Sequence, residues 1–187
     1  MQINAKVKYG KLENIIKAFS DDFAVKVGLL QKDGSNEEIS ENLDIAGLGA
    51  VHEFGAKIPV TNKMRAFFRW KFKINLKKST THIIIPPRSF IQMPLSKTAK
   101  FKSKIKQHLG DEDDVLYYVE ETGDVESIAI LVGASALEVI QEAFETGGWG
   151  EWTPNSQVTI NNKGSAMPLI DKGIILKNRI NYEVIKK

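Results

Sequence analysis

The stretch from Val125 to Phe144 constrains the fold more than any other part of the chain. Apolar side chains recur there at spacings of three and four residues, which is the period of one face of an α-helix. Three glycines at positions 147, 148 and 150 then end the helix and begin a loop that runs to about Met167. The predicted apolar face consists of Val125, Ile128, Ala129, Val132, Ala136, Val139, Ile140 and Ala143.

Shorter patterns on both sides of this helix predict further helices and a few strands. Strands are expected where β-branched and apolar residues cluster or alternate, at 23–30, 80–85 and 180–185. Helices are expected at 11–20, 44–54, 61–72, 94–109, 111–122 and 169–177. Asp44 is the expected N-cap of the second helix, and Pro94 is the expected first residue of the fourth. The polar segment 31–42 is expected to be a surface loop.

These elements predict an α+β fold. We expect one domain over residues 1–187, in which several helices pack on a small, mostly antiparallel sheet. A content of 42% apolar residues is enough for a core, and the absence of cysteine excludes disulfides and thiolate metal sites. The polar N-terminus does not resemble a signal peptide, and the longest apolar run, Ile128 to Ala134, is far shorter than the roughly 20 residues of a membrane span. We therefore expect a soluble protein with no membrane partner.

Catalytic and cofactor motifs are incomplete in this sequence. His52-Glu53 begins like a zinc-protease motif, but that chemistry needs a second histidine four residues after the first, and position 56 is Ala56. No phosphate-binding glycine loop, dinucleotide fingerprint or nucleophile elbow occurs, and the glycines around Trp149 lack a nearby lysine. We therefore expect no enzyme activity, no metal and no cofactor.

The charges of the chain are segregated along its length. From Phe54 to Gly110 there are 14 lysines and arginines and no acidic residue, whereas from Asp111 to Asn162 there are 12 acidic residues and no lysine or arginine. Such segregation suggests that charge steers an association. An alternative interpretation is that the two segments fold against each other within one chain.

The basic segment also carries aromatic residues. Between positions 63 and 73 five lysines and arginines alternate with Phe67, Phe68, Trp70 and Phe72. Basic residues bind phosphates and aromatic rings stack on bases, so the segment 63–106 gives an alternative function, a non-specific DNA-binding protein. The competing interpretation is that Phe67, Phe68 and Trp70 belong to the core face of an amphipathic helix.

Four short stretches together resemble a known family. They are Ala50-Val51-His52-Glu53-Phe54-Gly55, Ile85-Pro86-Pro87-Arg88-Ser89-Phe90, the Trp152-Thr153-Pro154 region, and Pro168-Leu169-Ile170-Asp171-Lys172-Gly173 followed by Ile180 to Val184. Their order and spacing resemble the phage virion-morphogenesis family, also described as tail-completion proteins. Two departures are Lys172, where the family pattern usually has threonine, and a stretch of about 101–124 that is longer and more charged, which indicates a charged helical insertion.

The resemblance implies a structural role in the virion, at the tail–head junction. It implies that the chain completes the tail end or neck and enables head–tail joining as an oligomeric ring adaptor, of six subunits by the same resemblance. The implied partners are other copies of the chain, the tail tube or tail terminator, and neck or head-connector proteins. A neck position also brings packaged DNA within reach.

From the split charge we predict that the basic segment of one subunit contacts the acidic segment of its neighbour. A head-to-tail ring needs two different complementary surfaces on each subunit, and opposite charges supply them. The helix from Lys97 to Lys106 carries five lysines outside its apolar stripe, more than the last turns of the 125–144 helix match. The interface candidates are Arg88, Lys97, Lys100, Lys104, Lys106, Trp149 and Trp152.

Overall fold

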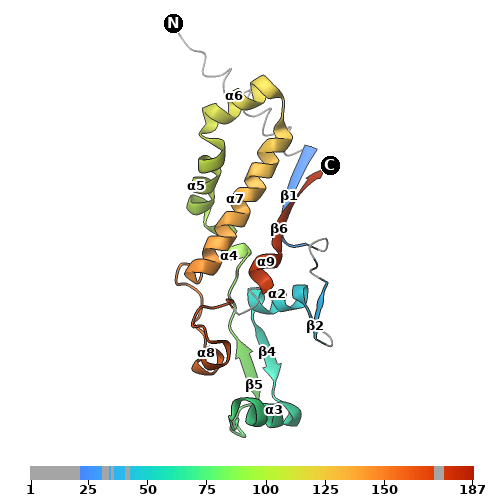
Figure 1. Ribbon diagram of the computed structural model, residues 1–187, viewed down its shortest axis with the longest axis vertical. Helices are drawn as coiled ribbons and strands as arrows, with labels where there is room; N and C mark the ends of the chain where they lie inside the picture. Colours follow the sequence, from blue (N-terminus) through green and yellow to red (C-terminus); the bar gives the residue numbers. More distant parts are fainter. Residues whose placement is uncertain (1–21, 31–33, 35, 41–42, 171–174) are drawn as a thin grey trace.

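The computed structural model describes residues 22–30, 34, 36–40, 43–170 and 175–187, and the helix expected at 11–20 lies outside these ranges. The described chain is elongated, with helices at one end and a thin extension at the other (Figure 1). It is an α+β fold, as the sequence predicts: helices dominate, and the strands form antiparallel pairs.

Helix α7 (Val125–Thr146) is the central element, and it confirms the strongest sequence pattern. Asp124 caps its N-terminus by accepting from the backbone nitrogen of Ser127, and Gly147 ends it with a φ of 63°. Helices α4 and α5 and strands β1 and β6 contact it. By length and composition alone α7 could also cross a membrane, but half of its most apolar stretch is buried inside the fold. Its buried residues are Ile128, Ala129, Gly133, Ser135, Ala136, Val139, Ile140, Ala143 and Phe144.

Strands from the two ends of the described chain pair on one side of α7. Strand β1 (Phe23–Leu29) runs antiparallel to β6 (Ile180–Lys186), with Phe23 opposite Lys186 and Leu29 opposite Ile180. Both strands were expected from the sequence. The ring of Tyr182 approaches α7 at Gly133, where a Cβ atom would lie 2.3 Å from a ring carbon. A glycine is therefore required for the strand to lie this close to the helix.

The segment expected as one helix at 94–109 forms two helices instead. Helix α4 (Gln92–Ser96) ends at Lys97, whose ψ of 71° leaves the helical region, and α5 (Thr98–Leu109) begins there. Pro94 is thus the third residue of α4 and not the first residue of a longer helix. Helix α6 (Glu112–Thr122), capped by Asp111, then joins α5 to α7 and forms one end of the molecule (Figure 1).

The other end of the molecule is formed by residues 56–85, which we call the arm. Helix α2 (Ile45–Phe54), capped by Asp44, leads into strand β4 (Ala56–Pro59), helix α3 (Asn62–Phe72) follows, and strand β5 (His82–Ile85) returns beside β4. Gly55, with a φ of 76° and a ψ of 171°, turns the chain directly from α2 into β4. A Cβ atom there would lie 2.9 Å from the carbonyl oxygen of Ile85.

Three further elements differ from the sequence prediction. Part of the loop expected at 31–42 is strand β2 (Glu38–Ser40), which pairs with β3 (Leu43–Asp44). The loop expected at 147–167 contains helix α8 (Gln157–Lys163). The last short helix, α9, covers Ile175–Arg179 and so lies later than the range 169–177. Each of these elements is seven residues or shorter, which is too short for a hydrophobic period to be read reliably.

We expect Ile140→Ala to lower the free energy of unfolding by about 2–5 kcal/mol, because this side chain is fully buried and its truncation leaves a cavity. The matched control is Ile130→Ala on the same helix, where the side chain is 41% exposed and the loss should stay within about 1 kcal/mol. Chemical denaturation of both variants measures the difference. Equal losses would contradict the placement of α7 in the core.

Candidate functional site

The carboxylate of Glu53, at the end of α2, is buried and binds the chain at the start of α4. One oxygen accepts from the hydroxyl of Ser89 at 2.6 Å and from the backbone nitrogen of Gln92 at 2.9 Å. The other accepts from the backbone nitrogens of Phe90 at 2.7 Å and Ile91 at 3.0 Å. These backbone donors lie at a helix start, where they have no partner within the helix. A single side chain therefore satisfies four donors that lie 36 to 39 residues further along the chain.

Arg88 fastens the same segment to a third part of the chain. Its backbone nitrogen donates to the carbonyl oxygen of His52 at 2.7 Å. Its guanidinium donates to the carbonyl oxygens of Thr153 at 2.8 Å and Pro154 at 3.2 Å. Burial lowers the pKa of Arg88, since a low-dielectric surrounding disfavours the charged form. The guanidinium thus replaces its hydration with backbone carbonyl groups.

Trp152 and Phe144 complete this arrangement with apolar contacts. The indole nitrogen of Trp152 donates to the carbonyl oxygen of Ser89 at 3.1 Å, and its ring meets Phe144 edge-on with centroids 5.6 Å apart. Phe90 lies on Phe144 in the same manner, at 5.4 Å, and Leu169 belongs to the same buried cluster. We call this set, centred on Glu53, Arg88 and Trp152, the junction.

The junction joins all four sequence stretches on which the family resemblance rests. Residues 50–55, 85–90, 152–154 and 168–170 meet there, although more than 100 residues separate the first stretch from the last. Two of these stretches supply the buried charged side chains, Glu53 and Arg88, that bind backbone groups of the others. Arg88 and Trp152, however, were predicted to be interface residues, and they are 7% and 5% exposed. That prediction is wrong for both, because the junction uses their donors and buries their surface.

The lysines of α5 face acidic residues of α7 and the following loop within the same chain. Lys97 pairs with Glu151, Lys100 with Glu142 at 3.3 Å and Lys104 with Glu138 at 3.4 Å. His108 continues the row with 2.8 Å to Glu138. The prediction that Lys97, Lys100 and Lys104 find their acidic partners in a neighbouring subunit is therefore wrong. Lys106 is exposed on another face of α5.

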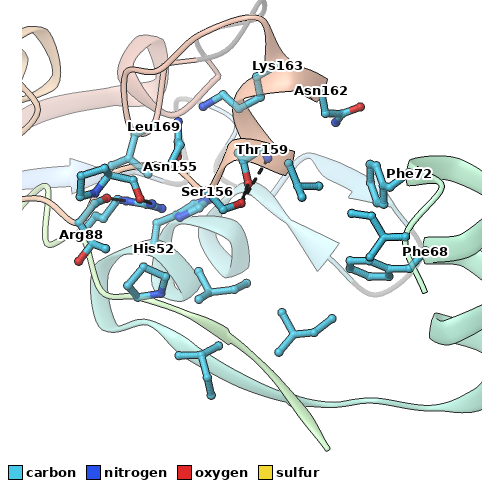
Figure 2. A pocket seen from close by; sticks show the side chains of 18 of the residues that line it. His52, Phe68, Phe72, Arg88, Asn155, Ser156, Thr159, Asn162, Lys163 and Leu169 are labelled. Atoms are coloured by element: carbon cyan, nitrogen blue, oxygen red, sulfur yellow. Dashed lines mark hydrogen bonds between the residues drawn. The ribbon is translucent and has the colours of Figure 1, made fainter. Parts of the chain in front are cut away.

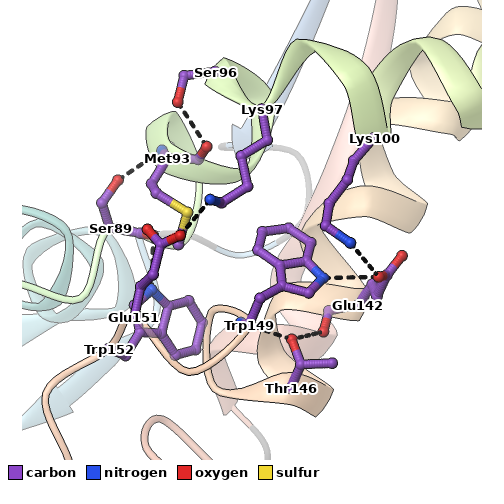
Figure 3. Close-up of polar contacts among 10 residues, drawn as sticks. All are labelled: Ser89, Met93, Ser96, Lys97, Lys100, Glu142, Thr146, Trp149, Glu151 and Trp152. Atoms are coloured by element: carbon purple, nitrogen blue, oxygen red, sulfur yellow. Dashed lines mark hydrogen bonds and ion pairs between the residues drawn. The ribbon is translucent and has the colours of Figure 1, made fainter.

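Trp149 lies within this row, as Figure 3 shows. Its indole nitrogen donates to Glu142 at 2.7 Å, and the ammonium of Lys100 lies 4.7 Å from the centre of its ring. The hydrogen bond from Trp149, together with Lys100 and Lys104, lowers the pKa of Glu142. Trp149, an interface candidate, is half-buried and fixes the loop after α7 against α5.

A mainly apolar cavity of about 790 Å³ lies between the arm, the junction and α8. Figure 2 shows Phe68 and Phe72 on one side of it, with Arg88 and Leu169 on the other. Several polar groups on its wall are engaged. Asn155 donates to the carbonyl oxygens of Ala166 and Met167, and the hydroxyls of Ser156 and Thr159 bond each other at 2.9 Å. Within the described ranges no group of three or more His, Asp and Glu side chains is placed to hold a metal ion.

The arm presents apolar and basic side chains to solvent. Trp70 is 69% exposed, Ile84 62% and Phe67 48%. The interpretation of Phe67 and Trp70 as core residues is thus wrong. The arm consists of one helix and two short strands, so it is too thin to cover both faces of α3. Of the aromatic residues of α3, Phe68 and Phe72 line the cavity, whereas Phe67 and Trp70 do not. Its exposed lysines are Lys57, Lys63, Lys71, Lys73, Lys77 and Lys78.

Two arginines of the arm serve its own structure. Arg65 donates to the carbonyl oxygens of Leu76, Lys77 and Thr80, and Arg69 donates to Asn75 at 3.0 Å. These bonds hold the turn after α3 against the helix. The exposed lysines, together with the exposed Arg69, therefore supply the outward charge of the arm.

The opposite end of the molecule, residues 111–126, is acidic, and we call it the tip. It comprises α6 and the start of α7. Tyr117 is 69% exposed there, and the hydroxyl of Tyr118 donates to Asp124 at 3.1 Å. The charged insertion expected at about 101–124 thus corresponds to the second half of α5 together with the tip. Figure 1 places the tip and the arm at the two ends of the long axis.

Searches with this chain find no matching protein-family model, no matching curated protein and no matching solved structure. The functional interpretation therefore depends on the residues and geometry of the chain itself.

We expect Glu53→Gln to lower the free energy of unfolding by about 2–4 kcal/mol. Whichever oxygen becomes the amide nitrogen, two of the four donors lose their acceptor and face another donor. Glu121→Gln, on the exposed face of α6, is the matched control and should change stability by less than about 0.5 kcal/mol. Denaturant titration measures the stability of both variants. A loss no larger than that of the control would contradict the structural role assigned to Glu53.

We expect Trp149→Phe to raise the pKa of Glu142 toward its ordinary value of 4.5, because the strongest interaction that lowers it is the indole hydrogen bond. Lys100→Met, which removes both a hydrogen bond and a positive charge, should also raise it. A carboxylate with a lowered pKa contributes stability that is present above 4.5 and is lost as the pH falls through the folded pKa. The variant should therefore lose less stability on acidification, and carboxyl carbon NMR titrations measure the pKa. An unchanged pKa of Glu142 in Trp149→Phe would contradict the role of the indole.

Proposed function

We propose that this chain is a structural protein of a tailed phage, which completes the tail end or neck and enables head–tail joining as an oligomeric ring adaptor. The proposal rests on one observation: the stretches that resemble the virion-morphogenesis family are the ones that meet in the junction. Their residues hold backbone segments together, as a shared scaffold requires. The resemblance thus concerns the architecture of the chain and not isolated short matches.

The surfaces of the molecule support an assembly role. The arm and the tip project away from the junction and expose large apolar side chains, Trp70 and Tyr117 among them. Aromatic residues are enriched in protein interfaces, where they contribute much of the binding energy. The side chains at the junction are engaged in hydrogen bonds to backbone groups, which supports our proposal that the chain is not an enzyme.

A specific observation favours non-specific DNA binding as a second candidate function. The arm places exposed Trp70 and Phe67 among exposed lysines, and bases stack on such rings while lysines bind phosphates. The two candidates differ in the surface that they use. DNA would engage the arm alone and would be repelled by the acidic tip, whereas a ring subunit uses two different surfaces.

Deletion of the gene from the phage or prophage that carries it should yield DNA-filled heads and separate tails, with few joined particles, in electron micrographs. The gene supplied from a plasmid should restore joining, which controls for effects on neighbouring genes. A plasmid copy with Glu53→Gln should restore it only at temperatures at which the variant is folded. Normal joined virions from the deletion strain would exclude this role.

A further inference from the structure

The ion pairs within the chain leave two strongly charged regions at its ends. Lys97, Lys100 and Lys104 are neutralised along α7, in the middle of the molecule. The arm, residues 56–85, carries eight lysines and arginines and no acidic residue, a formal charge of +8. The tip, residues 111–126, carries eight aspartates and glutamates and no lysine or arginine, a formal charge of −8. The two ends are thus equal and opposite in charge.

Both ends also expose apolar surface beside these charges. On the arm, Trp70, Phe67 and Ile84 are 69%, 48% and 62% exposed. On the tip, Tyr117 is 69% exposed and Tyr118 37%. Lysines of the arm can lie over the exposed tyrosine rings of the tip, which allows cation–π contacts in addition to ion pairs. Each end therefore has an apolar centre with charges around it, which is the usual composition of a protein interface.

The two ends cannot meet within one molecule, because the junction and α7 hold them at opposite ends of the long axis (Figure 1). We propose that the arm of one copy of this chain binds the tip of a second copy, head to tail. The contact is heterologous, so each copy has one arm and one tip to offer and the association continues until a ring closes. This inference deepens the proposed ring adaptor by assigning its subunit contact, and it therefore rests on that proposal.

Charge complementarity favours a second copy over DNA as the occupant of the arm. A duplex would neutralise the arm but would leave the tip without a role and would be repelled by it. A second copy satisfies both ends with the same contact. The association should weaken with salt, because the screening length falls from about 10 Å at 0.1 M to about 3 Å at 1 M.

The test is the mass of the full-length protein in solution, measured by sedimentation at low and high salt. The arm variant is Lys63→Glu with Lys71→Glu, and the tip variant is Glu120→Lys with Glu121→Lys. All four side chains are exposed. We expect the parent to form salt-sensitive oligomers and each variant to associate about tenfold more weakly or worse. Circular dichroism of each variant tests whether it is folded.

Mixing the two variants gives the sharpest result. The arm variant keeps an intact tip and the tip variant keeps an intact arm, so an equimolar mixture should associate at least to the dimer under conditions in which each variant alone stays monomeric. The matched control is Lys102→Glu with Lys106→Glu on the exposed face of α5, which changes the net charge as the arm variant does. This control should assemble as the parent does.

Three results would overturn the contact. These are a parent that is monomeric at every salt concentration, a control that dissociates as the arm variant does, or a mixture that stays monomeric. A monomeric parent that binds duplex DNA, and loses that binding in the arm variant, would assign the arm to nucleic acid instead. If the purified protein forms oligomers but the deletion strain makes normal virions, the contact between copies is supported and the proposed function is excluded.

Discussion

The buried carboxylate of Glu53 is the interaction on which the rest of the structure depends. It receives four hydrogen bonds from Ser89, Phe90, Ile91 and Gln92, and so fixes the end of α2 to the start of α4. An ionised group can be buried only where donors replace its hydration, so the four donors must all be in place. The position of the arm follows from this constraint, because β4 leaves α2 directly after Glu53 and β5 returns directly before Arg88.

The molecule has a tightly packed centre around this carboxylate and two more exposed ends, the arm and the tip. The centre is tightly packed, because Phe144 lies between Phe90 and Trp152. Its polar groups are satisfied, because the guanidinium of Arg88 donates to the carbonyl oxygens of Thr153 and Pro154. The arm and the tip, in contrast, consist of thin helical and two-stranded elements whose outer faces no other part of the described chain covers. A scaffold of this kind presents two surfaces at a fixed separation, which is what a subunit of an assembly needs.

The segregated charges have two physical roles in this arrangement. In the middle of the molecule, lysines of α5 neutralise glutamates of α7, with Trp149 between Lys100 and Glu142. Exposed pairs of this kind contribute little stability each, but they fix the rotation of α5 on α7. At the two ends charges of one sign are concentrated instead, because the arm is basic and the tip is acidic. The two interpretations of the charge pattern therefore apply to different segments. The lysines of α5 pair within the chain, and the arm and the tip carry the charges of the proposed association.

The sequence by itself determined the local elements. The period of three and four residues specified α7, Asp44 specified the start of α2, and alternation specified β1 and β6, because each signal lies within the element itself. Only the tertiary structure decided which side chains are buried. Glu53 meets its partners 36 to 39 residues away and Arg88 meets Thr153 across 65, and no local pattern encodes such distances. The same holds for Trp70. Its position in the helix pattern is typical of a core face, but its burial depends on whether another element covers that face of α3. No element of the described chain covers it.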